Sequence, residues 1–164
     1  MMNFTEKQKF KQVWIWLLLL GIACVGIWGA VQQLIFKIPF GNKPAPDWVM
    51  ILIVFATFLP IMLFWFLQLE TEVDSTGIYY RFRPFHFKKR FIAWNEITEA
   101  HVREYKPLKE YGGWGIRGSV RNGKAFNVSG NKGLQVVLSN GKKILLGTQK
   151  DLELADCISK LKKN

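Results

Sequence analysis

Two long uncharged stretches dominate the first half of the chain. Residues 13–36 and residues 48–69 contain no Asp, Glu, Lys, Arg or His. Their 24 and 22 residues would form helices about 36 and 33 Å long, whereas the hydrocarbon core of a bilayer is about 30 Å thick. The pattern therefore predicts two transmembrane helices, one at 13–36 and one at 48–69.

The segment between these stretches, residues 37–47, favours a turn because it contains three prolines and one glycine. Gly26 and Ala30 lie four residues apart in the first stretch, and small residues at this spacing let a second helix approach closely. We expect the two helices to pack against each other as an antiparallel hairpin within one chain.

After the second stretch the pattern changes to the alternation that is typical of strands. Residues 69–74 and 78–83 both alternate, and the second places Ile78, Tyr80 and Phe82 on one face. The Ser-Thr-Gly sequence between them predicts a hairpin turn. Further strands are predicted at 89–94, 97–105, 115–120, 125–128, 134–138 and 143–147.

The end of the chain returns to helical spacing. Leu154, Ile158 and Leu161 recur on one face of a helix, and Thr148 followed by Asp151 is similar to a capping box. The expected fold is therefore a two-helix transmembrane hairpin followed by a mainly β barrel or sandwich. That domain would contain about seven strands and be closed by a C-terminal α-helix.

These patterns divide the chain into five parts. They are an N-terminal segment at 1–12, helices at 13–36 and 48–69 with a loop at 37–47 between them, and a β domain at 70–164.

The distribution of charge indicates an orientation. Of the 23 Lys and Arg residues, 18 follow the second apolar stretch, and only Lys37 and Lys43 lie between the stretches. Lys7, Lys9 and Lys11 precede the first one. Because cytoplasmic flanks are the ones rich in Lys and Arg, we expect both termini to be cytoplasmic, the loop at 37–47 to be external, and the protein to lie in the cell membrane.

Cations also mark the candidate binding surfaces. The β domain at 70–164 carries 18 basic and 10 acidic side chains. The candidate residues for a lipid or a partner are a basic group, Arg81, Arg83, Lys88, Lys89 and Arg90, and a loop group, Trp114, Arg117 and Arg121. Juxtamembrane cations contribute about 1 kcal/mol each near an anionic leaflet. For the basic group a solvated strand face is an equal alternative, and for the loop group a solvated loop is the preferred one.

Two glycine-rich segments match nucleotide-binding patterns only in part. GWGIRGSV, which begins at Gly113, is not followed by the helix that a dinucleotide site requires. GSVRNGKA, which begins at Gly118, has Ala125 where a P-loop has a hydroxyl, and its Asn122-Gly123 is more typical of a hairpin turn. We expect no cofactor.

Other site chemistry has little support. His86 and His101 have no Cys or paired carboxylate at ligand spacing, so a metal site is not expected. Nucleic-acid binding suits the positive charge, but the membrane tether and the missing recognition motif count against it.

Several short segments resemble a known family. They are FIAWNEI, with Ile92, Trp94, Glu96 and Ile97, the paired strands QVVLSNGKKILLG, the segment YGGWGIRG and the closing helix. In this order, after a two-helix hairpin, the chain resembles the membrane-anchored bacterial proteins with a pleckstrin-homology-like (PH-like) domain. The resemblance implies a binding or assembly module rather than a catalyst, and it transfers no active-site residue.

The first functional hypothesis is a non-enzymatic integral membrane protein whose PH-like domain binds a protein partner, or its own copies, at the cytoplasmic membrane face. The second is a module that senses anionic lipid head groups through residues 81–90. A membrane enzyme of unknown reaction ranks third.

Overall fold

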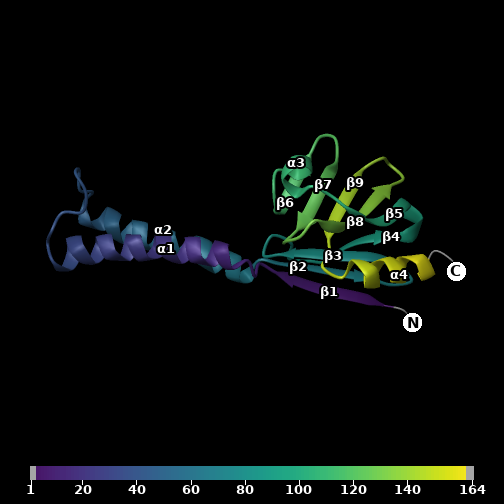
Figure 1. Cartoon of the computed structure of the whole chain (residues 1–164), viewed down its shortest axis with the longest axis horizontal. Helices are drawn as coiled ribbons and strands as arrows, with labels where there is room; N and C mark the ends of the chain where they lie inside the picture. Colours follow the sequence, from purple (N-terminus) through teal and green to yellow (C-terminus); the bar gives the residue numbers. More distant parts are fainter. Residues whose placement is uncertain (1–2, 162–164) are drawn as a thin grey trace. The chain divides into compact units, whose positions relative to one another are not determined.

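The computed structural model describes residues 3–161. The ends of the predicted segments 1–12 and 70–164, at residues 1–2 and 162–164, lie outside the described residues. The chain forms two compact units. Lys11–Phe66 make up the helical unit, and the chain up to Phe10 together with the chain from Leu67 onward makes up the β unit. Figure 1 labels their elements.

The helical unit contains α1 (Val13–Ala30), which continues as a π-helical turn, η1 (Val31–Ile35), and α2 (Asp47–Phe66). Both helices are long and apolar enough to cross a membrane. Core helices of soluble proteins also meet this criterion, but they are mostly buried, whereas most residues of these two helices are exposed in the structure. The two helices are therefore candidate membrane spans.

The two helices pack against each other as an antiparallel pair. A Cβ atom at Gly26 would lie 3.2 Å from Thr57 Cγ2, so the glycine lets α2 approach closely. The rings of Trp16 and Trp65 meet edge to face with centroids 6.0 Å apart. At the other end of the pair, Gln33 Nε2 donates to the Ala45 carbonyl oxygen at 2.6 Å. The expected packing within one chain is confirmed.

The β unit contains two sheets that are not joined into a closed barrel. The first has the order β1-β2-β3-β4, and all its neighbours are antiparallel. Its strands are β1 (Phe4–Lys9), β2 (Gln68–Val73), β3 (Gly77–Arg83) and β4 (Arg90–Ala93).

The second sheet has the order β5-β8-β9-β7-β6 and is mixed, because β7 and β9 run parallel. Its strands are β5 (Ile97–Glu104), β6 (Gly115–Ser119), β7 (Gly123–Asn127), β8 (Lys132–Leu138) and β9 (Lys143–Gly147). Three helices complete the unit: η2 (Trp94–Glu96), α3 (Pro107–Tyr111) and α4 (Asp151–Leu161). All eight strands predicted from the alternation after residue 68 are present within a few residues of their expected bounds.

The core lies between the sheets and beneath α4. Phe126 on β7 contacts two aromatic rings of β3, with centroids 5.1 Å from Tyr80 and 6.5 Å from Phe82. Ile78, Tyr80 and Phe82 are all buried, as their alternation predicted. Leu154 and Ile158 of α4 are buried as well. The first sheet, the second sheet and the C-terminal helix therefore share one apolar interior.

The strand β1 was not predicted. Residues 4–9 were assigned to a separate polar segment, yet they pair with β2 in register from Phe4 opposite Val73 to Lys9 opposite Gln68. The inward positions of β1 include Glu6 and Gln8, which are buried. Polar residues at inward positions hide the strand from a hydrophobic pattern. The domain therefore begins before the helical unit and resumes after it.

Hydrogen bonds to Gly147 and to the connection between β9 and α4 hold these buried polar side chains, although Gln8 Oε1 has no hydrogen-bond partner among the described residues. Thr148 Oγ1 donates to Glu6 Oε2 at 2.7 Å, and the Gln149 N–H donates to Glu6 Oε1 at 2.9 Å. Gln8 Nε2 donates to the Gly147 carbonyl oxygen at 2.6 Å. Thr148 was expected to cap α4 together with Asp151. Instead its hydroxyl binds Glu6 and accepts from the Lys150 N–H at 3.0 Å, one turn before the helix.

The end of the second apolar stretch also differs from the prediction. The helix was expected to continue to residue 69, but α2 ends at Phe66 and Gln68 already belongs to β2. Leu67 and Leu69 are buried in the β unit. The chain passes from the helix into the strand through Leu67, Gln68 and Leu69 without a charged residue, so the pattern alone could not separate the two elements.

Candidate functional site

The predicted basic group at 81–90 is largely bound by carboxylates of β2. Arg81 Nε and Nη2 donate to Glu70 Oε2 at 2.9 and 2.6 Å, and Arg83 Nε lies 3.4 Å from Glu70 Oε1. The cause is the register, which places Glu70 directly opposite Arg81. Only 6% of the Glu70 side chain is exposed. The charge of Arg81 is thus neutralised within the sheet.

The same face holds a second ion pair, and two cations without one. Lys89 Nζ lies 2.6 Å from both carboxylate oxygens of Glu72. Lys88 and Arg90 form no ion pair with any residue between 3 and 161. The structure therefore divides the predicted group into three carboxylate-bound cations and two that remain available.

The glycine-rich loop uses its predicted site residues to hold its own shape. Trp114 Nε1 donates to the Gly130 carbonyl oxygen at 3.0 Å, and Arg117 Nε donates to the Trp114 carbonyl oxygen at 2.9 Å. Gly113 and Gly115 have φ values of 124° and 110°, which favour glycine. Strands β6 and β7 follow the glycines, so no helix N-terminus is available there for a phosphate.

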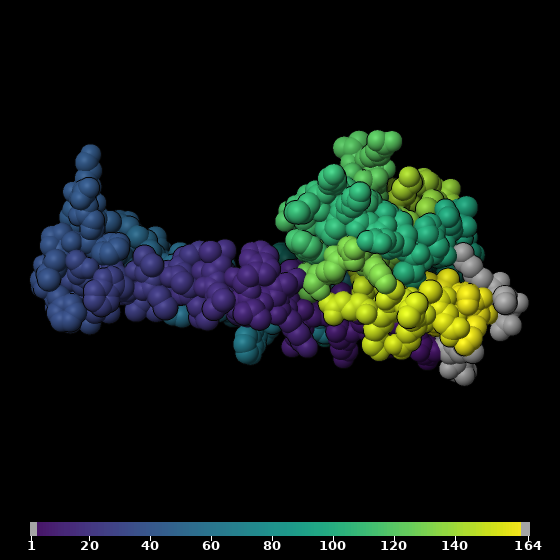
Figure 2. Space-filling model, in the orientation of Figure 1, coloured from purple at the N-terminus to yellow at the C-terminus, as the bar shows by residue number. Residues whose placement is uncertain are grey.

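Arg121 and Arg90, by contrast, meet in a hollow of about 720 Å³ on the β unit. The wall is formed by the turn between β6 and β7, which projects from the surface in Figure 2, by the turn between β8 and β9, and by the start of β4. The described lining residues include no carboxylate. Five cations line the hollow: Arg90, Arg121, Lys124, Lys142 and Lys143.

A close approach of two strands brings these cations together. In the parallel register Lys124 lies opposite Ile144, so the starts of β7 and β9 are side by side. Gly123 has φ +78°, and a Cβ atom there would lie 2.2 Å from the Lys143 carbonyl oxygen. Only glycine fits this contact. The first sheet supplies Arg90, which lies opposite Tyr80 in the backbone register of β3 and β4.

The short helix α3 anchors the turn that carries Arg121. Tyr111 Oη donates to the Asn122 carbonyl oxygen at 3.2 Å. Asn122 Nδ2 in turn donates to the Glu110 carbonyl oxygen at 3.2 Å. These bonds hold the backbone of the turn beside α3, and so fix one wall of the hollow.

An ion pair holds α3 itself. Arg103 Nη2 lies 2.7 Å from Glu110 Oε2. The hydrogen bond from Arg103 keeps the pKa of Glu110 below its ordinary value, and burial opposes this effect. Burial raises the pKa of Tyr105 and of Tyr111, so both phenols remain neutral at physiological pH. The network behind the hollow is therefore structural in character.

None of the five cations of the hollow forms an ion pair with another residue in the described part of the chain. The pKa of the neighbouring His86 is lowered by burial and by two of these cations. Burial lowers its pKa most, and the charges of Arg90 and Lys124 lower it further. The surroundings of His86 thus carry a positive potential that carboxylates do not offset.

This arrangement is suited to holding an anion. Guanidinium and ammonium groups form strong, charge-assisted hydrogen bonds with phosphate and carboxylate oxygens. A concave wall whose charged groups are all cations also raises the local concentration of such anions.

Other chemistry has less support at this place. The Ser119 hydroxyl accepts the Asn122 N–H at 3.2 Å, which gives it a role in the turn. Among residues 3–161, no three His, Cys, Asp or Glu side chains gather where they could hold a metal ion.

Three cations of the hollow were missed from the sequence. Lys124 was considered only as part of an incomplete P-loop, and Lys142 and Lys143 only as part of a hairpin. A usable signal was present, because Asn-Gly-Lys occurs twice, at 122–124 and at 140–142. Each copy predicts a tight turn with a lysine beside it. What the sequence does not show is that the two turns are neighbours in space.

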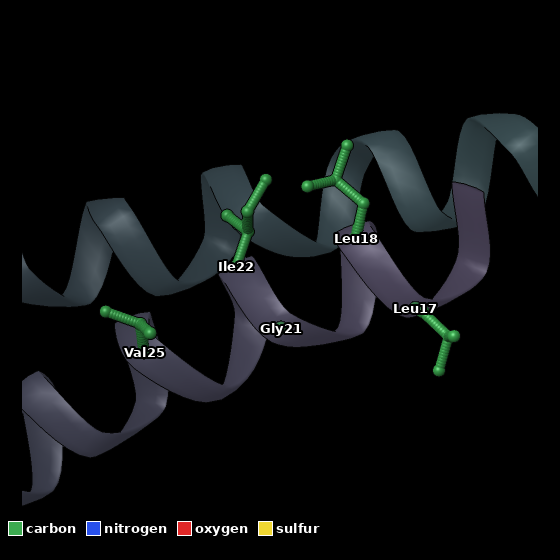
Figure 3. Close-up of a pocket in the computed structure, with 5 residues that line it drawn as sticks. All are labelled: Leu17, Leu18, Gly21, Ile22 and Val25. Carbon is green, nitrogen blue, oxygen red and sulfur yellow. The ribbon is translucent and has the colours of Figure 1, made fainter. Parts of the chain in front are cut away.

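The helical unit has a hollow of a different kind. Figure 3 shows it on the surface of α1, lined by Leu17, Leu18, Gly21, Ile22 and Val25. A Cβ atom at Gly21 would meet nothing within 4 Å. All the lining groups are apolar, so this hollow offers shape but no polar recognition.

Neither a scan against models of known protein families nor a search of curated proteins finds a match for this chain.

Proposed function

We propose that the chain is a non-enzymatic, membrane-anchored protein whose β unit is a PH-like binding module for an anionic group on a partner molecule. The observation that carries this proposal is the hollow with five unpaired cations and no carboxylate in its described wall. Unpaired cations are costly to bring together, because they repel one another. A ligand that supplies negative charge removes this cost.

The two helices support the anchoring part of the proposal. Their length and apolar composition match a bilayer, and their large side chains are mostly exposed. Lys9 at the end of β1 lies opposite Gln68 at the start of β2, and α1 and α2 attach close to these residues. Both ends of a spanning hairpin would therefore lie on one side of the membrane. The excess of Lys and Arg in the β unit supports the placement of that side in the cytoplasm.

The choice of surface separates the two main hypotheses. Lipid sensing through residues 81–90 has less support, because Arg81, Arg83 and Lys89 are bound to Glu70 and Glu72. The hollow shares only Arg90 with that group. We therefore place recognition of a partner in the hollow. A membrane enzyme gains no support from a wall in which no described carboxylate or histidine takes part.

The binding test uses the full chain in nanodiscs of zwitterionic lipid. The probes are inositol hexakisphosphate for phosphate groups and hexaglutamate for carboxylates, measured by titration calorimetry. We expect binding of at least one probe, and a loss of tenfold or more in the triple variant Lys124→Gln, Lys142→Gln, Lys143→Gln. The control variant Lys106→Gln, Lys109→Gln, Lys150→Gln changes the net charge equally at exposed lysines outside the hollow.

Two results would overturn the proposal. One is that the native chain binds neither probe. The other is that the hollow variant and the control variant lose affinity equally, since binding would then follow net charge and not the hollow. Orientation is tested separately with reporters fused to the C-terminal end and within residues 41–46. A reporter signal that places the C-terminal end outside the cell would contradict the cytoplasmic assignment.

A further inference from the structure

The loop between β3 and β4, residues 84–89, exposes large aromatic side chains. Phe85 is 56% exposed and Phe87 is 92% exposed. Single exposed apolar side chains are common, but neighbouring exposed aromatic side chains form a patch of the kind that marks an interaction site. The loop also carries Lys88, which is exposed and forms no ion pair within the described residues. Exposed aromatic groups beside a free cation form an amphipathic tip.

Internal contacts fix the conformation of this tip. The His86 N–H donates to the Phe82 carbonyl oxygen at 2.8 Å, which closes the turn. The His86 ring lies against the sheet, with its centroid 5.3 Å from that of Phe126. His86 points inward and Phe87 is turned outward, whereas Phe85 is partly exposed with its ring centroid 6.5 Å from that of Phe82. Their exposure therefore follows from a fixed turn.

The strand register places this loop at one particular end of the first sheet, where β3 terminates. Arg83, the last residue of β3, lies opposite Gln68, the first residue of β2. Gln68 also lies opposite Lys9, the last residue of β1. Three chain segments therefore extend past the same end of the sheet: the one that leads to α1, the one that arrives from α2, and the loop at 84–89.

The distances involved are short compared with the bilayer interface. Neighbouring strands are about 5 Å apart, and two extended residues add about 7 Å. From this geometry we expect Phe85 within about 12 Å of Gln68, the second residue after the end of α2. The polar interface of a bilayer is about 5–8 Å deep on each side. A loop at this end of the sheet can reach the interface that the end of α2 enters.

We propose that the loop at 84–89 inserts Phe85 and Phe87 into the membrane interface, with Lys88 at the level of the lipid phosphates. Aromatic side chains favour this layer, and lysine reaches head groups from it. The proposal rests on the proposed anchoring of α1 and α2 in a bilayer. It gives the β unit a third attachment besides the two chain connections, and so holds the hollow in one orientation toward the lipid surface.

The test measures the depth of a nitroxide spin label in the full chain, reconstituted in nanodiscs. A background with Cys24→Ala and Cys157→Ala receives a single label at residue 87, at residue 18 of α1 or at residue 152 of α4. Leu18 and Leu152 are exposed like Phe87. We expect labels 87 and 18 to be accessible to oxygen and protected from a water-soluble nickel chelate. The label at 152 should show the opposite.

Each outcome tests one part of the proposal, either the insertion of the loop or the anchoring of the helices. Nickel accessibility at 87 equal to that at 152, with 18 protected, would overturn the loop insertion and leave the anchoring intact. Nickel accessibility at 18 would overturn the anchoring itself. A second variant, Phe85→Ser with Phe87→Ser, checks the role of the rings. Because both are exposed, the fold should persist, and a label at residue 88 should become several-fold more accessible to nickel.

Discussion

Two surfaces of the β unit both gather cations and yet differ in chemistry. On the outer face of β2 and β3, Arg81, Arg83 and Lys89 are bound to Glu70 and Glu72. In the hollow, five cations line one wall without a carboxylate from the described residues. The first surface uses charge to hold strands together, and the second keeps charge available. A run of basic residues in sequence therefore does not identify a binding site, whereas unpaired cations that line one hollow make a stronger candidate.

The largest expected effect concerns the contact that builds the hollow. Gly123→Ala would force a Cβ atom to within 2.2 Å of the Lys143 carbonyl oxygen at φ +78°. We expect it to lower the free energy of unfolding by about 2 kcal/mol or more. Gly130→Ala is the matched control, because Gly130 has the same φ and open space around it. Equilibrium unfolding of the full chain in detergent measures both, and equal losses would refute the close approach.

The next effect tests the paired surface. Glu70→Ala leaves Arg81, whose side chain is only 19% exposed, without its partner. We expect a loss of roughly 1–3 kcal/mol in the free energy of unfolding. Glu72→Ala removes an exposed pair and should cost less than about 1 kcal/mol. If neither change alters stability, the carboxylates do not hold this face.

A third effect separates binding from stability on the two surfaces. In the hollow, the triple change of Lys124, Lys142 and Lys143 to Gln should weaken probe binding at least tenfold, which is about 1.4 kcal/mol. It should not lower stability, because it removes repulsion between like charges. On the paired surface, Lys89→Gln should leave probe affinity unchanged. Calorimetry and unfolding on the same samples decide, and a loss of stability in the hollow variant would contradict the comparison.

The smallest effect is a change in proton binding at His86. Burial and the charges of Arg90 and Lys124 hold its pKa below the ordinary 6.5. The unfolded chain therefore binds this proton more readily, so the stability contribution is complete above pH 6.5 and is lost as the pH falls from 6.5 toward the folded pKa. An anion in the hollow should raise the pKa of His86. Titration of its ring protons by NMR, with and without the phosphate probe, measures the shift, and an unchanged pKa at saturating probe would argue against binding beside Arg90.

Local patterns were sufficient to predict most elements. Alternation located both strands of the hairpin around Ser75–Gly77, and helical spacing of Leu154 and Ile158 located α4. The strand β1 was missed because its inward positions include Glu6 and Gln8, and their partners lie about 140 residues further along the chain. A pattern of apolar residues carries no information about such distant polar pairs.

The candidate site was predicted less well, for a related reason. Arg90 and Arg121 were selected as cations, but in separate groups. What joins them is the parallel pairing of β7 with β9 and the contact of Gly123 with Lys143. Parallel pairing connects strands that are remote in the chain, so no local signal announces it. The ion pairs that remove Arg81 from the available cations likewise depend on a register that only the fold reveals.

The position of β1 also sets an order of events during biosynthesis. Phe4 on β1 pairs with Val73 on β2, and the chain between these two strands forms the helical unit and its connections. A ribosome must therefore release both helices before the first strand can find its neighbour. Under the proposed anchoring, a chain with only one helix across the bilayer would have β1 and β2 in different compartments, and its first sheet would stay incomplete. Completion of the sheet would then require a hairpin inserted with both ends on the same side.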